Sequence, residues 1–185
     1  MADDNDPGRL LLGMRGWPHP EWRGHFFPHD LPAEWEFAYF SNEASCLLLP
    51  PDDWLALRQE QLDEWLDECE PWFRFYLEDP GPDLPLDRLG WFRSALGGVL
   101  VRDPGRELPE DVPLWRPDAS RGCWVERHGG AVLSRWNIAG EDLRALKARL
   151  QALPDRSVAV MVEGDGVLPD RLHELQTLAD LLGVA

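Results

Sequence analysis

The sequence of 185 residues is poor in lysine and has no long apolar run. Lys147 is its only lysine, and acidic residues outnumber basic ones so strongly that the net charge is −16. A field of that sign repels nucleic-acid phosphates and anionic lipids, so we expect neither nucleic acid nor a membrane among its partners. The apolar run Leu10–Leu12 is also too short for a signal peptide or a membrane span.

Cysteines are few and unpaired in the sequence. Cys46, Cys69 and Cys123 are widely spaced and form no Cys-x-x-Cys motif. An odd, sparse set of this kind is typical of free thiols in a reducing compartment, so we expect a cytoplasmic protein.

Familiar catalytic and metal-binding motifs are missing too. No Gly-x-Ser-x-Gly, P-loop or Gly-x-Gly-x-x-Gly pattern occurs. His25 and His29 have helical spacing, but Pro18, Pro20 and Pro28 prevent a helix there, and no second cluster supplies further ligands. We therefore expect no metal site and no cofactor.

What the chain does have is apolar strands alternating with helices. Strands are expected at residues 10–16, 45–49, 72–77, 98–101, 123–126, 131–136 and 157–162, and helices at 31–42, 52–69, 86–96, 143–153 and from Pro169 to near Gly183. Residues 103–118 form a proline-rich connection. Residues 1–8 are expected to be a disordered acidic tail, which leaves one α/β domain over residues 9–185.

Two features of these elements bear on the site. Strands that are apolar on both faces and alternate with helices predict a parallel sheet, whose ligands bind beyond the carboxyl ends of the strands. Gly129-Gly130 lie between two short strands and favour a β-hairpin near residues 122–136. A helix end followed by a strand is the competing interpretation.

The most distinctive segment follows the first expected strand. It runs Gly13-Met-Arg-Gly16-Trp17-Pro-His-Pro-Glu-Trp22-Arg23-Gly24-His-Phe-Phe27-Pro28, with Leu31-Pro32 and Tyr39 after it. This segment resembles the opening of the YecE-like family, a bacterial family of unknown function, which has Gly-Thr-Ser-Gly-Trp-x-Tyr-x-x-Trp-x-Gly-x-Phe-Tyr-Pro there. Fainter matches follow in the same order at residues 73–78, 98–104, 157–163 and 172–182.

The resemblance implies a TIM-barrel-like fold. The chain is shorter than typical members, so we predict a reduced or incomplete TIM-like barrel of parallel strands and helices. An open parallel α/β sheet with a hairpin near residues 122–136 is the alternative.

The chain also departs from the family pattern at the ends of later strands. Leu48 takes the place of a glutamate in a Val-Glu-Ile-Asn pattern, Glu78 that of a lysine, and Arg102 that of a glutamine. The asparagine-rich end of the last strand becomes Glu163-Gly-Asp-Gly. Polar groups that the family brings together at several strand ends are therefore lost or altered here.

Arginine and aromatic side chains make the first loop the candidate ligand site. Arg15 and Arg23 offer the fork geometry of an anion clamp, and Trp17 and Trp22 offer stacking walls. Two tryptophans that plug the barrel mouth and two arginines that pair with surplus acids would give the same pattern. The other candidate ligand-binding residues are His19, Glu43, Arg102 and Glu163, which we expect on or near the same face.

Two functions follow from these residues. The first is a non-catalytic or catalytically reduced module that binds a small anionic ligand or a protein partner. The alternative is an enzyme that acts on a small anionic, possibly phosphorylated, substrate at the carboxyl face of the barrel, with Glu43 or Glu163 as base.

Overall fold

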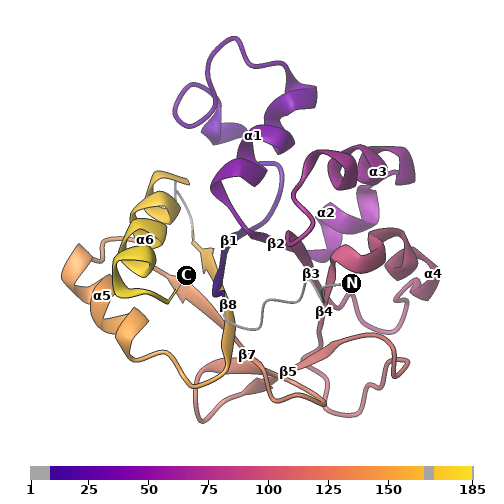
Figure 1. Cartoon of the computed structure of the whole chain (residues 1–185). Coiled ribbons are helices and arrows are strands. Elements are labelled where there is room, and N and C mark those ends of the chain that lie inside the picture. Colours follow the sequence, from indigo (N-terminus) through magenta and orange to yellow (C-terminus); the bar gives the residue numbers. More distant parts are fainter. Residues whose placement is uncertain (1–8, 165–168, 185) are drawn as a thin grey trace, which may run out of the picture.

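Eight strands close into a barrel in the order β1 to β8 in the computed structural model, which describes residues 9–164 and 169–184 (Figure 1). The strands are β1 (Leu11–Arg15), β2 (Cys46–Leu49), β3 (Arg74–Glu78), β4 (Leu96–Leu100), β5 (Leu114–Asp118), β6 (Cys123–Glu126), β7 (Val132–Asn137) and β8 (Ser157–Glu163). The TIM-barrel-like prediction is thus confirmed. Because β1 pairs with both β2 and β8, the barrel is complete, and the alternative of an open sheet is wrong.

Helices surround only part of this barrel. They are α1 (Glu36–Glu43), α2 (Pro51–Ala56), α3 (Gln59–Glu68), α4 (Leu86–Leu89), α5 (Leu143–Gln151) and α6 (Pro169–Leu182), with short 3-10 helices at Pro20–Trp22, Ala33–Trp35 and Gly90–Ala95. In Figure 1 they lie beside β1 to β4 and beside β7 and β8. Within the described residues no helix connects β4 to β5, β5 to β6 or β6 to β7. The barrel is therefore reduced in its helices and not in its strands.

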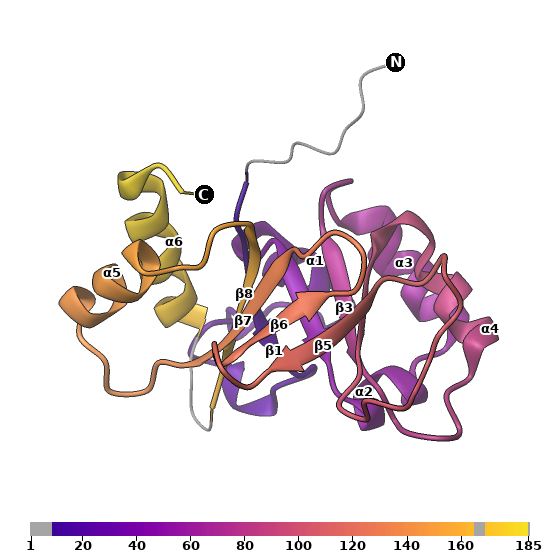
Figure 2. The same ribbon diagram turned by 90° about the horizontal axis from the view of Figure 1, so that it is seen from below.

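Strand β6 runs against its neighbours. It pairs antiparallel with β5 and β7, whereas every other neighbouring pair is parallel. An antiparallel neighbour needs only a tight turn, while a parallel one needs a long crossover. The predicted hairpin is confirmed as β6–β7, and Figure 2 shows β5 and β6 side by side on this flank of the barrel.

Strand β5 was not expected, because it lies inside the segment predicted as a connection over residues 103–118. Pro117 conceals it, since a proline within an apolar run argues against a central strand. In the structure β4 pairs only with Leu114 and Trp115, and Pro117 pairs with Trp124 of β6. The proline therefore lies beyond the part of β5 that bonds to both neighbours.

One long helix was predicted over residues 52–69, and the structure has two. The chain is extended at Leu57 and Arg58, which separates α2 from α3. The carbonyl of Leu55, which would accept from residue 59 in a continuous helix, accepts instead from Arg88 Nη1 at 2.5 Å. The side chain of Leu57 stays buried at this break.

Two apolar clusters hold the barrel together. One contains side chains from the strands alone and fills the barrel interior; its buried members are Cys46, Leu48, Tyr76, Leu100, Trp115, Trp124, Leu133, Ala159 and Met161. The other lies between the strands and the surrounding helices and includes nearly all the aromatic residues of the first loop. The interior is therefore packed with side chains rather than open as a channel.

Within the described residues no helix is long and apolar enough to span a membrane. The expected tail, residues 1–8, lies outside the described residues, and the single domain over residues 9–185 stays a prediction.

Gly13 allows β1 and β2 to approach closely. A Cβ added there would lie 1.9 Å from the carbonyl oxygen of Cys46, and backbone cannot give way as a flexible side chain can. We therefore expect Gly13→Ala to lower the free energy of unfolding by about 3 kcal/mol or more in urea denaturation. Gly90→Ala is the control, because nothing lies within 4 Å of its Cβ position. Equal effects of the two substitutions would contradict this account of the strand contact.

Candidate functional site

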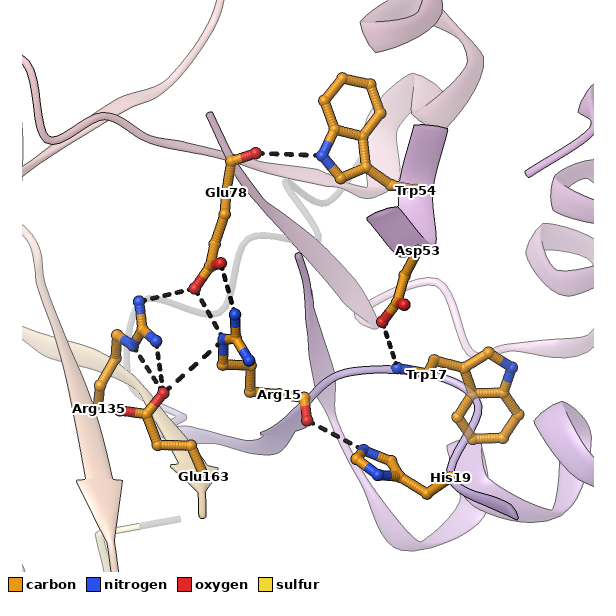
Figure 3. Close-up of polar contacts among 8 residues, drawn as sticks. All are labelled: Arg15, Trp17, His19, Asp53, Trp54, Glu78, Arg135 and Glu163. Carbon is orange, nitrogen blue, oxygen red and sulfur yellow. Dashed lines mark hydrogen bonds and ion pairs between the residues drawn. The ribbon is translucent and has the colours of Figure 1, made fainter. Parts of the chain in front are cut away.

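Four charged side chains lie together at the carboxyl ends of β1, β3, β7 and β8 (Figure 3). Arg15 donates to Glu78 through Nε and Nη2, each at 2.8 Å. Nη1 of Arg135 lies 2.8 Å from Oε1 of Glu78. Arg135 also donates to Oε2 of Glu163, through Nε at 3.0 Å and through Nη2 at 2.5 Å. Arg15 Nε also lies 3.9 Å from Glu163. We call these four residues the mouth network.

The mouth network balances its own charge. Burial raises the pKa of the Glu78 carboxyl, but the hydrogen bond from Arg15 and the charges of Arg135 and Arg15 outweigh it, so the pKa lies below its ordinary value. Glu78 is thus held as a carboxylate between two arginines. Below the network lies the cluster of buried, mostly apolar side chains that fills the barrel, with Leu48 among them.

The first loop is fixed to the mouth by backbone contacts. Asp53 Oδ2 of α2 accepts from the backbone N–H of Trp17 at 2.7 Å, and His19 Nε2 lies 3.1 Å from the carbonyl of Arg15 (Figure 3). Gly16 has φ +92° where the chain leaves β1, a conformation that favours glycine. Burial raises the pKa of Asp53, against the opposing hydrogen bond from Trp17 and the charges of His19 and Arg15.

The two loop tryptophans are part of the outer core. Trp22 is fully buried and stacks against His19, with ring centres 4.3 Å apart, and against Phe40, with ring centres 5.8 Å apart. Trp17 is 7% exposed and meets Phe37 and Trp65 edge to face. Trp22 therefore presents no open face for a ligand, whereas Trp17 lines the cavity described below.

The two arginines expected to form one clamp are occupied separately. Arg15 belongs to the mouth network, and Arg23 Nη2 lies 2.7 Å from Glu36 Oε1 at the start of α1. Of the two interpretations of this loop, arginines paired with acids is the one that the contacts match.

Of the other candidates, Glu163 lies in the mouth network, and Arg102 and Glu43 lie apart from it. Arg102 follows β4, is exposed, and lies over the ring of Trp124 at 5.3 Å. Glu43 ends α1 and lies 3.3 Å from His173 Nδ1 of α6. Because α1 leads into the amino end of β2, the expectation that Glu43 lies on the ligand face is wrong.

A cavity of about 420 Å³ lies outside the barrel, between the first loop with α1 on one side and α2 with α3 on the other. Its charged and polar lining consists of Arg23, Glu34, Glu36, Asp52, Asp53, Gln61 and Glu64, and its apolar lining of Trp17, Pro18, Ala33, Phe37, Leu49, Ala56, Leu57 and Trp65. Within the described part of the chain, no three acidic, histidine or cysteine side chains lie together as metal ligands would.

Sequence reasoning missed Arg135, Asp53 and Glu36 as members of these sites. Arg135 lies in a short hairpin strand and meets Glu78 only after barrel closure. Asp53 and Glu36 were hidden among the 34 acidic residues of the chain. The usable signal for Asp53 was its place in the first turn of α2, which follows β2 on the carboxyl face where ligands bind.

No family model and no curated protein sequence match this chain. Among solved structures, the fold is similar to a DUF72 family protein from Thermotoga maritima MSB8, with a TM-score of 0.63 and 12% identity over 95% of this chain and 99% of that chain. It is also similar to a DUF72 family protein from Enterococcus faecalis V583, with a TM-score of 0.54 and 10% identity over 96% of this chain and 99% of that chain. At these identities the likeness shows the shared fold.

Removing the Glu78 carboxylate tests the mouth network. Glu78→Gln leaves Arg15 and Arg135 short of a counter-charge, so we expect the free energy of unfolding at pH 7 to fall by about 1–3 kcal/mol. The pKa of Glu78 is lower in the folded state than in the unfolded state. Its carboxylate therefore stabilises the fold fully above the unfolded-state pKa of about 4.3, and this stabilisation is lost as the pH falls through the folded-state pKa.

Urea denaturation from pH 7 to pH 3 measures this dependence. The difference between wild type and Glu78→Gln should shrink as the pH falls, because protonated Glu78 resembles the amide. Glu110→Gln, at an exposed position, is the control and should change neither the free energy of unfolding nor its dependence on pH. A constant difference across this range would show that Glu78 acts through packing rather than charge.

Proposed function

We propose that this protein is a divergent member of the YecE-like, or DUF72, family that works as a non-catalytic binding or interaction module. The observation that carries the proposal is the mouth network, in which two glutamates neutralise two arginines above an apolar interior. The opening motif over residues 13–28 and the shared barrel support the family assignment. The free thiols Cys46, Cys69 and Cys123 favour the cytoplasm.

The mouth of the barrel lacks the convergence of free polar groups that catalysis needs. A barrel enzyme needs groups from several strand ends aimed at one reacting atom, with at least one free to accept or donate a proton. Here Glu78 and Glu163 are both engaged by arginines, and Leu48 provides no polar group at the end of β2. The groups at the mouth hold one another above a packed interior.

The alternative is an enzyme for a small anionic substrate, and one observation favours it. Nη1 of Arg135 is buried and makes no well-aligned hydrogen bond, although it lies 2.8 Å from Glu78 Oε1. A phosphate or carboxylate that displaced Glu163 would find this donor beside Arg15. That substrate would have to break existing ion pairs in order to bind.

Anion titration separates the two functions. In wild type we expect phosphate and citrate to leave the unfolding temperature unchanged in thermal-shift measurements, because the guanidinium groups already have partners. Glu78→Gln/Glu163→Gln removes both carboxylates and should create phosphate binding, seen as a rise of a few degrees. Should the double variant fail to fold, Glu163→Gln alone, whose side chain is 28% exposed in wild type, is the substitute.

Glu110→Gln is the control for this titration and should bind no phosphate. A phosphate-dependent rise in wild type that Arg15→Ala abolishes would contradict the closed mouth on which the proposal rests and would show the anion site that the alternative enzyme requires.

A further inference from the structure

The cavity beside the first loop has a charge opposite to the one expected of this loop. Its lining has five carboxylates, from Glu34, Glu36, Asp52, Asp53 and Glu64, against a single arginine. Of the five, only Glu36 has a basic partner within 4 Å among the described residues. An anion would meet net repulsion here, whereas a cation would be drawn in.

Aromatic rings form the wall behind these carboxylates. Trp17, Phe37 and Trp65 line the cavity and are each at least nine-tenths buried. Phe37 and Trp65 stack at 4.4 Å between ring centres, and Trp17 meets Trp65 edge to face at 5.9 Å. These mutual contacts fix the rings before any ligand binds. Aromatic rings beside carboxylates favour ammonium and guanidinium groups.

A guanidinium group is already present on this wall. Arg23 Nη2 lies 2.7 Å from Oε1 of Glu36, whose side chain is only 10% exposed, while the Arg23 side chain itself is 59% exposed. The acceptor is therefore built into the core and the cation comes from the solvent side. Because the exposed partner is the easily displaced one, an external cation can take the place of Arg23 on the same carboxylate.

We propose that this cavity binds a cationic group, an ammonium or guanidinium carried on an alkyl chain, with Glu36 and Asp53 on its inner side and Trp17 and Trp65 as its wall. The inference rests on the proposed binding role and names its ligand class. The volume of about 420 Å³ suits one extended amine or one arginine side chain rather than a large molecule. Such a group can come from a free polyamine or from an arginine-containing peptide.

Calorimetric titration with agmatine, spermidine and a short arginine-containing peptide tests the proposal and distinguishes the two sources. We expect saturable binding of at least one probe, weakened severalfold by raising the salt from about 0.1 M to 0.5 M. Glu34→Gln/Glu64→Gln, at two exposed cavity positions, should weaken binding about fivefold or more. Glu60→Gln, on an exposed position of α3 outside the cavity, is the matched control and should change nothing.

Arg23→Ala gives a test of opposite sign. If Arg23 competes with the ligand, its removal should tighten cation binding, and circular dichroism confirms that the variant is folded. If Arg23 belongs to an anion clamp, its removal should leave cations unbound and weaken any anion binding.

Two results would overturn the inference. One is that none of the three probes, up to about 10 mM, releases or absorbs heat or changes the tryptophan fluorescence. At that concentration a binding free energy of only a few kcal/mol is still detected. The other is binding that Glu60→Gln weakens as much as the cavity variants do. Either failure leaves the non-catalytic role intact, because that role is tested by phosphate at the barrel mouth.

Discussion

Two arginines and two glutamates hold one another across the mouth of the barrel, and the placement of the first loop depends on them. Arg15 is both the last residue of β1 and a member of this network, so the loop begins from a fixed point. His19 returns to the carbonyl of Arg15, and Asp53 holds the backbone of Trp17. The loop is thereby fastened at three successive places before its tryptophans enter the outer core.

The same arrangement divides the carboxyl face into two regions of different chemistry. Over the barrel axis, opposite charges cancel above a packed interior. To one side, between α1 and the α2–α3 pair, carboxylates outnumber the single arginine around an aromatic wall. Arg15 and Arg23 lie eight positions apart in a loop that resembles an anion clamp, yet each is engaged by a different glutamate in a different region.

Local patterns in the sequence predicted most of the fold, whereas the site depended on pairing between distant residues. Alternating apolar strands and helices gave the parallel sheet, and Gly129-Gly130 gave the hairpin. Strand β5 was concealed by Pro117, and the carbonyl of Leu55 at the break between α2 and α3 accepts from Arg88, more than thirty positions away. Arg15 finds Glu78 at a separation of 63 residues, and with 34 acidic residues available no sequence pattern singled out that partner.

The reversed strand β6 also explains how the barrel can lack helices on one flank. Short turns replace the crossover segments there, and the loop before β5 is held by Arg116 and Arg127, whose guanidinium groups donate to the carbonyls of Asp103 and Leu108. Because the sheet is closed, this flank has no open strand edge, although the described residues place no helix over it. A shortened barrel of this kind loses its helical cover without becoming a template for strand-to-strand aggregation.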